Sequence, residues 1–311
     1  MINKLASLLL LFSACSHDPS LLPTSKTYKT KNVFIVIMDG ARYSETWGEP
    51  SQQYIPHIKQ LSATGVIANN FYNDGETITV AGHTAVTTGN YQLINNGGLE
   101  IPAYVSLFQL YLSQFAKPAT DAWIFSSKDK LAVLADCMDI QWKGKFNPHA
   151  DCGVNGVGTG YREDSVTYTH LIDTLDMYHP HLVVINFKHP DAAAHANNWS
   201  EYLSQIKTVD SYIGKLWKHL QSDSAYVGTT TMFVVNDHGR HLDGVADGFV
   251  SHGDKCEGCR HIMLMALGPD FKKNYKEKNH YSLVDIYSTT CDLLGINASA
   301  NDGKVMRTIF Q

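Results

Sequence analysis

Six aspartates and histidines that could bind metal lie next to apolar runs of the sequence. In chain order they are Asp39, Asp191, His195, Asp237, His238 and His252. Each aspartate follows shortly after an apolar run of the kind that forms a buried strand. Carboxylate and imidazole groups are zinc ligands, and six of them suffice for two ions with three protein ligands each and an open position for substrate. The spacing therefore predicts a two-metal centre if the fold brings these residues together.

Each of these residues, taken alone, also has a structural explanation. The Asp-Gly after the first run is a common turn, and the Asp-His-Gly after the third run fits a polar loop. The aspartate and histidine four residues apart fit an exposed pair on one helix. What favours the metal centre is that all of them fall at the ends of predicted strands.

The elements that must position these residues are predicted from hydrophobic periodicity. Continuous apolar runs predict five buried strands, at 33–38, 122–126, 182–187, 231–236 and 262–267. Apolar residues three and four apart predict a long crossover helix at 199–220 and further helices at 104–115 and 282–294. We expect an α/β fold with a mostly parallel central sheet flanked by helices on both faces. Ligands collect at the carboxyl ends of the strands in such sheets.

A threonine lies at the start of a further predicted helix, in the segment Thr-Val-Ala-Gly-His-Thr that begins at Thr79. Threonine is a common capping residue, so a structural role is one interpretation. A helix N-terminus also attracts phosphate, because its first backbone N–H groups are unpaired and the helix dipole is positive there. Thr79 is therefore also a candidate nucleophile for phosphate chemistry.

The order of these residues resembles the alkaline phosphatase superfamily, in particular its members with a threonine nucleophile. These are the periplasmic alkaline phosphatases and the type I phosphodiesterases and nucleotide pyrophosphatases. The matching elements run from about residue 33 to 270. The resemblance implies one metal ion at Asp191, His195 and His252. It implies a second ion at Asp39, Asp237 and His238, with Thr79 bridging toward the phosphorus. Zinc is the metal expected from these ligands, and manganese remains an alternative.

The resemblance also covers two lysines and an asparagine that would contact the phosphate group of the substrate. Lys128 and Lys130 lie in Ser-Ser-Lys-Asp-Lys, which is similar to a Ser-x-Lys-Asp-Arg element whose Lys and Arg contact phosphoryl oxygens. Asn96 lies where both threonine groups place a substrate-binding asparagine. Positive charge on terminal phosphate oxygens favours a dianionic monoester, although lysine at position 130 lacks the bidentate geometry of arginine.

The resemblance thus implies a metal-dependent phosphoester hydrolase that forms a phosphothreonine intermediate, above all a phosphate monoesterase acting on small-molecule phosphate esters. A phosphodiesterase or nucleotide pyrophosphatase with the same site remains an alternative. A catalytically silent, metal-binding envelope lipoprotein is the alternative from another class.

Composition and the N-terminus indicate an exported protein. The 311 residues carry a net charge of −5, so no nucleic-acid partner is indicated. Residues 1–15 have the pattern of a lipoprotein signal peptide that ends at Cys15, with ordinary signal cleavage as the alternative. We expect a tether at 16–31 and a single catalytic domain at 32–311 with an insertion around 90–160. The expected location is the periplasm or cell envelope of a bacterium, anchored to the membrane through a lipid on Cys15.

The expected location also bears on the redox state of the five remaining cysteines. An oxidising compartment favours disulfides, and Cys137 with Cys152 and Cys256 with Cys259 are the candidate pairs. The Cys-x-x-Cys spacing of the second pair also suggests zinc or redox chemistry, but no second such pair occurs, so a disulfide is the preferred interpretation. Cys291 lies in a predicted helix and is expected to be a buried thiol.

Overall fold

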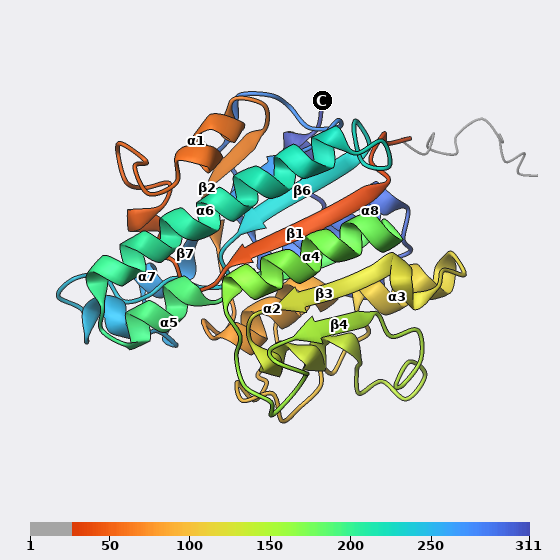
Figure 1. Cartoon of the computed structure of the whole chain (residues 1–311), viewed down its shortest axis with the longest axis horizontal. Coiled ribbons are helices and arrows are strands. Elements are labelled where there is room, and N and C mark those ends of the chain that lie inside the picture. Colours follow the sequence, from red (N-terminus) through yellow and green to blue (C-terminus); the bar gives the residue numbers. More distant parts are fainter. Residues whose placement is uncertain (1–26) are drawn as a thin grey trace, which may run out of the picture.

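The protein forms an α/β structure in which one nine-stranded sheet lies between two layers of helices (Figure 1). This is a computed structural model, and it describes residues 27–311. The strands are β1 (Asn32–Met38), β2 (Val66–Tyr72), β3 (Ala122–Ser126), β4 (His149–Cys152), β5 (Leu182–Phe187), β6 (Thr230–Val235), β7 (His261–Leu267), β8 (Tyr275–Glu277) and β9 (Tyr281–Ser282). Their order is β4-β3-β5-β1-β6-β7-β2-β8, with β9 paired to β2.

The sheet is mostly parallel, as predicted. β4, β3, β5, β1 and β6 pair in parallel, whereas β7 runs antiparallel to both of its neighbours, β6 and β2. The direction of β7 matters for the site, because it brings the start of this strand to the edge where the parallel strands end. A residue that precedes β7 can therefore meet residues that follow β1, β5 and β6.

Eight α-helices accompany the sheet in the described part of the chain. They are α1 (Pro56–Ser62), α2 (Thr79–Thr88), α3 (Leu107–Gln114), α4 (Asp164–Tyr178), α5 (His189–His195), α6 (Trp199–Ser222), α7 (Glu257–Arg260) and α8 (Leu283–Leu294). A 3-10 helix, η4 (Asp129–Ala135), follows β3.

The two faces of the sheet carry separate cores because successive side chains of a strand point to opposite faces. Along β1, residues 33, 35 and 37 pack with α2, α3 and α8, while residues 34, 36 and 38 pack with α1, α4, α5 and α6. Figure 1 shows α4, α5 and α6 across the front of the sheet and α2, α3 and α8 behind it. Both faces of β1 are thus fully buried, as its unbroken apolar run predicts.

The predicted strands are confirmed, each within one residue of its predicted ends, and the crossover helix is α6. The sequence analysis missed β2, β4, β8 and β9. β2 has two asparagines at its centre, where its pairing with β7 is irregular, so no continuous apolar run marks it. Between residues 27 and 311, no helix has both the length and the apolar character of a membrane span.

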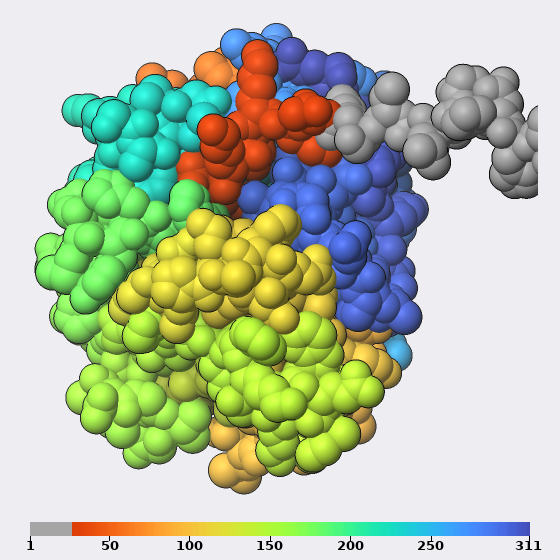
Figure 2. Space-filling view, turned by 90° about the vertical axis from the view of Figure 1, so that its right-hand side faces the viewer, coloured from red at the N-terminus to blue at the C-terminus, as the bar shows by residue number. Residues whose placement is uncertain are grey.

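The predicted signal peptide, Cys15 and most of the tether lie outside the described residues. The end of the predicted tether is attached to the domain: the backbone N–H groups of Lys29 and Thr30 donate to Asp270, each at 2.9 Å. Figure 2 shows these first described residues, in red, beside the C-terminal residues in blue. The predicted insertion around 90–160 contains β3 and β4, which belong to the central sheet.

The expected disulfides are absent, because all five cysteines between residues 27 and 311 are free thiols. Cys152 ends β4 and its Sγ faces the carbonyl of Ile124 at 3.9 Å, whereas the Cys137 thiol lies beside Gln109 and Asp139. These two thiols therefore have different neighbours. Burial raises the pKa of Cys291 to about 12, so it is a buried neutral thiol, as predicted.

Candidate active site

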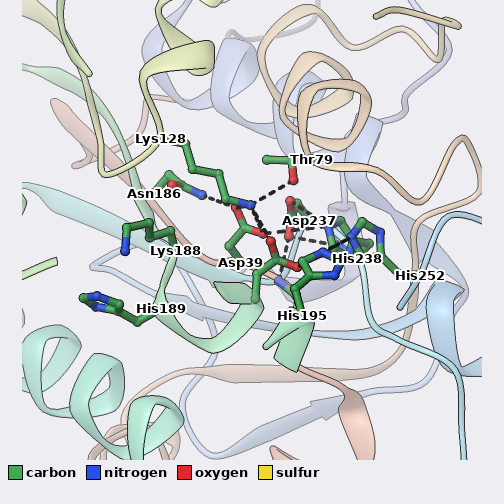
Figure 3. Close-up of polar contacts among 12 residues, drawn as sticks. Asp39, Thr79, Lys128, Asn186, Lys188, His189, His195, Asp237, His238 and His252 are labelled. Atoms are coloured by element: carbon green, nitrogen blue, oxygen red, sulfur yellow. Dashed lines mark hydrogen bonds and ion pairs between the residues drawn. The ribbon is translucent and has the colours of Figure 1, made fainter. Parts of the chain in front are cut away.

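The six predicted metal ligands lie together at the edge of the sheet where the parallel strands end (Figure 3). Asp39 follows β1 directly, and Asp237 and His238 follow β6. Asp191 and His195 lie on α5, the short helix after β5. His252 lies in the loop that leads through α7 into β7. The antiparallel direction of β7 is what brings this last residue to the others.

One group consists of Asp39, Asp237 and His238, all completely buried. A ligand atom of each lies within 4.8 Å of the other two. The Nε2 atom of His238 is 3.7 Å from Oδ1 of Asp39 and 3.4 Å from Oδ2 of Asp237. These are the three residues that the sequence analysis assigned to the metal beside Thr79.

The second group consists of Asp191, His195 and His252. The Nε2 atom of His195 is 3.3 Å from Oδ1 of Asp191 and 3.1 Å from Nε2 of His252. The Nε2 atom of His252 is in turn 3.5 Å from Oδ1 of Asp191. The ring of His252 stacks on that of His238 with centroids 3.7 Å apart, so the two groups adjoin.

The residues present fit divalent cations. Oδ2 of Asp237 and Nε2 of His238 are buried and have no hydrogen-bond partner, although buried polar atoms are normally satisfied. Burial lowers the pKa of His238 to about 3 and that of His252 to about 4, so both imidazoles are neutral at neutral pH. Neutral imidazole and ionised carboxylate are the forms that bind metal.

Backbone carbonyls orient two of the histidines. Nδ1 of His238 lies 2.9 Å from the carbonyl oxygen of Gly239, and Nδ1 of His252 lies 2.7 Å from that of Thr77. Because a carbonyl can accept but not donate, each Nδ1 carries the proton and each Nε2 has its lone pair directed into the site. His195 differs, because its Nδ1 lies 3.2 Å from the guanidinium of Arg240 and its side chain is half exposed.

The predicted nucleophile and phosphate contacts lie beside the first group. The Oγ1 atom of Thr79 is 3.1 Å from Nζ of Lys128, which also donates to Asp39 at 2.9 Å and to Asp191 at 2.6 Å. Asn96 accepts a hydrogen bond from the backbone N–H of Val80 at 3.0 Å and one from Lys130 at 3.2 Å. Thus two lysines and one asparagine lie around the start of α2, where Thr79 is the first residue.

Helix α2 begins at Thr79, and Ile78 is its N-cap, so Thr79 is not the capping residue that the structural interpretation of the sequence expects. Ile78 has no side-chain hydrogen-bonding group, so no N-cap side chain caps the helix. Thr79 is the first helical residue, and its hydroxyl is therefore not a capping group. Asn96 takes over one of the free backbone N–H groups from a loop sixteen residues away. The helix approaches the site closely at Gly82, where a Cβ atom would lie 2.7 Å from the carbonyl oxygen of Asp237.

The charges of the site are mutually compensating. Burial alone would lower the pKa of Lys128, but Asp191 and Asp39 raise it above its ordinary value, so the ammonium is charged. Burial likewise raises the pKa of Asp191, but Lys128, His195 and Arg240 together outweigh burial and hold that pKa well below the usual range. Burial and the nearby Lys128 lower the pKa of Lys130 to about 8.

Sequence reasoning missed three residues that support the ligands. Asn186, near the end of β5, donates to Oδ2 of Asp39 at 2.8 Å and lies 3.1 Å from Nε2 of His83. His83 lies one turn after Thr79 on α2, and its Nδ1 contacts the Thr79 carbonyl oxygen at 2.8 Å. Arg240 is completely buried and forms an ion pair with Asp191. Two of them carried a usable signal: Asn186 is polar within an apolar run, and Arg240 follows the Asp-His-Gly segment.

Comparison with known proteins assigns the chain to a family. The model of the metalloenzyme superfamily matches residues 116–298. No curated protein sequence matches the chain. Among solved structures, murine ectonucleotide pyrophosphatase/phosphodiesterase 5 is similar with a TM-score of 0.65 and 16% identity over 90% of this chain and 100% of that chain.

Two bacterial structures are also similar. The phosphonate monoester hydrolase of Agrobacterium radiobacter has a TM-score of 0.65 and 15% identity over 90% of this chain and 77% of that chain. The lipoteichoic acid synthase LtaP from Listeria monocytogenes has a TM-score of 0.63 and 15% identity over 87% of this chain and 73% of that chain. At such identities these likenesses concern the fold, and the family follows from the match over residues 116–298. The chain belongs to the metalloenzyme superfamily, the alkaline-phosphatase-like group that the order of its residues resembles.

Proposed function

We propose that the protein is a two-metal phosphoester hydrolase that uses Thr79 as its nucleophile and prefers phosphate monoesters. The observation that carries this proposal is the position of Thr79 as the first residue of α2, with its Oγ1 3.1 Å from Nζ of Lys128 and beside the buried group around Asp39. A hydroxyl in this position has a cationic neighbour and lies at a helix N-terminus, where the helix dipole is positive.

The reaction would proceed in two displacements. Oγ1 of Thr79 gives up its proton to solvent and attacks the phosphorus. As the new P–O bond forms, the bond to the leaving alcohol breaks, and its electron pair stays on the alcohol oxygen, which then takes up a proton. Water next attacks the phosphothreonine, which releases phosphate and restores the hydroxyl. Two divalent ions, held by the two groups of ligands, would supply the electrostatic activation of the hydroxyl and the stabilisation of developing charge.

The residues around the start of α2 would hold the phosphoryl oxygens. Lys128 is charged and positioned between Thr79 and the carboxylates, while Lys130 is held toward Asn96. A pKa of about 8 for Lys130 leaves much of this side chain charged at neutral pH. Two cations at this point favour a dianionic monoester group, because a diester carries one charge fewer.

The comparisons support phosphoester chemistry at a coarser level. The similar structures include one of the murine protein in complex with AMP, made with a threonine-to-alanine variant described as inactive. They also include enzymes whose names refer to phosphonate monoesters and to phosphodiesters or nucleotide pyrophosphates. A phosphodiesterase or nucleotide pyrophosphatase activity is therefore the rival within the same chemistry. Zinc is the metal we propose, with manganese as its rival, because the ligands are imidazoles and carboxylates.

We also propose that the enzyme is exported and attached to the cell envelope through Cys15. This rests on the pattern of residues 1–15. Labelling of the expressed full chain with a fatty acid tests it, with Cys15→Ala as the control. An unlabelled wild-type protein would contradict the lipid anchor.

The proposal is tested by hydrolysis of an aryl phosphate monoester and the matching diester, with zinc and with manganese. Thr79→Ala should lower turnover by about 10,000-fold or more, as for other catalytic nucleophiles. It should keep its bound metal, because the six ligands remain. Thr79→Ser, which retains a hydroxyl, is the matched control and should keep measurable activity. A wild-type preference for the diester would refute the monoesterase assignment, and full activity of Thr79→Ala would refute the nucleophile.

A further inference from the structure

A second cluster of metal-binding residues lies outside the six ligands described above. It consists of His241, Asp254, Cys256 and Cys259, each of which has one ligand atom within 4.8 Å of those of the others. His241 and Cys259 are buried, Cys256 is half-buried and Asp254 is exposed. The cluster therefore lies at the protein surface with one side open and the other in the core.

Local structure assembles three of these residues. Cys256 is the N-cap of α7 and Cys259 is the third residue of that helix, so the turn brings both thiols to one side. The backbone N–H of Cys256 donates to Oδ1 of Asp254 at 2.9 Å. This bond turns the carboxylate back toward the thiols.

The fourth residue arrives from the segment after β6. The backbone N–H of His241 donates to the carbonyl of Ser251 at 3.2 Å, which closes the intervening loop. Nε2 of His241 lies 3.1 Å from Oδ2 of Asp254, so this nitrogen faces the cluster. On the other side of the ring, Nδ1 lies 3.0 Å from Oδ1 of Asp247. A carboxylate on the far nitrogen is the usual partner of a metal-bound histidine, because it fixes the ring and its tautomer.

We propose that these four residues bind a structural zinc ion, separate from the two ions of the active site. Two thiolates, one imidazole and one carboxylate match the preference of zinc for four nitrogen, sulfur and oxygen ligands in a closed site. Sulfur ligands distinguish it from the active site, where the predicted ligands are carboxylates and imidazoles. Binding would displace the two thiol protons, which are released to solvent. This inference does not depend on the proposed function.

A disulfide between Cys256 and Cys259 competes for the same sulfur atoms. It was the preferred interpretation of the sequence, but both thiols are free in the structure. A disulfide also gives no role to the convergence of His241 and Asp254 on the two thiols, nor to the orientation of His241 by Asp247. These contacts are what favour zinc.

The proposed ion would fix the segment that carries an active-site ligand. Thr77 links the two places: its hydroxyl donates to the Asp254 carbonyl at 2.7 Å, and its own carbonyl faces Nδ1 of His252 at 2.7 Å. Thr77 also lies two residues before Thr79. Zinc in the cluster would therefore hold the loop of His252 and the start of α2 in a fixed relation.

The first test is the zinc content of the purified full chain after loading with zinc and removal of excess. A Cys256→Ser/Cys259→Ser variant should bind one zinc ion fewer per chain than the wild type. Cys291→Ser, which removes a buried thiol elsewhere, is the control and should bind the same number as the wild type. With cobalt in place of zinc, the wild type and the control should show thiolate-to-cobalt charge-transfer absorption, and the double variant should lack it.

The second test separates zinc from a disulfide. His241→Ala keeps both cysteines, so a disulfide between them would be unaffected by it. Loss of one zinc ion per chain and a weaker cobalt charge-transfer band in this variant would therefore support the proposed site. Thiol alkylation of unfolded wild-type protein in chelator, without reductant, should modify both Cys256 and Cys259. Equal zinc content in the wild type and the double variant, or failure to alkylate this pair, would overturn the proposal.

Discussion

Replacing Lys128 with methionine should destabilise the metal-free protein strongly and the metal-loaded protein much less. The ammonium of Lys128 lies 2.6 Å from Asp191 and 2.9 Å from Asp39, and its side chain is almost completely buried. Methionine fills similar space but leaves two buried carboxylates without this cation. Divalent ions bound to the same carboxylates would compensate much of that charge, which is why the two states should differ.

The magnitude follows from the burial of this ion pair. Removing one partner of a buried pair costs about 3–5 kcal/mol, since the remaining charge is left uncompensated. That is a large part of the total stability of a domain, which is about 5–15 kcal/mol. For a domain of this size the melting temperature should fall by roughly 10 °C.

The assay is thermal unfolding of both proteins in chelator and in saturating zinc. Lys188→Met is the matched control, because Lys188 is also buried but its nearest carboxylate is Glu163 at 3.9 Å, an exposed side chain. The control should lose little stability in either condition. An equal loss for Lys128→Met with and without zinc would show that the carboxylates are not where the metal binds, and no loss in chelator would refute the electrostatic argument.

Three further predictions follow from the same geometry. In chelator, the free energy of unfolding should fall by about 4 kcal/mol between pH 7 and pH 5, because His238 and His252 take up protons on unfolding but, with folded pKa values of about 3 and 4, not while folded. Urea unfolding at both pH values measures this, His252→Gln should roughly halve the loss, and a flat profile would contradict it. Asn186→Ala should weaken metal binding by about 10- to 100-fold, as measured by chelator competition, because it removes the 2.8 Å hydrogen bond that orients Asp39; unchanged affinity would deny it this role. Gly82→Ala should lower the melting temperature despite a gain in helix propensity of about 1 kcal/mol. The reason is that its Cβ would lie 2.7 Å from the carbonyl oxygen of Asp237, which follows β6. A more stable variant would show that α2 can move away freely.

Most of the fold was predictable because buried strands leave a local signal. β1, β5 and β6 are continuous apolar runs, and each is buried on both faces. β2 was missed because its central asparagines interrupt the run, and its place beside β7 depends on pairing with distant residues. The antiparallel direction of β7 was also beyond local pattern, since an apolar run is the same for either direction.

The grouping of the six candidate ligands was predictable for a related reason. Strands that run in parallel end at the same edge, so residues that follow them are brought together whatever the details of the loops. Their metal-binding role remains a prediction, supported by the unpartnered Asp237 and His238 atoms. The structure contains no disulfide among residues 27–311, and for Cys137 and Cys152 the reason is that pairing depends on loop conformation, which spacing in the sequence does not determine.

The sequence by itself determined which residues follow the buried strands, and hence which carboxylates and imidazoles meet, because strand burial and chain direction are encoded locally. The tertiary structure alone decided what surrounds them. Lys128 lies between two carboxylates, Asn96 binds the start of α2, and His241 joins the two cysteines of α7. Each of these contacts joins segments far apart in the chain or depends on the course of a loop. Such contacts arise from strand order and loop packing, and no periodicity in the sequence records either.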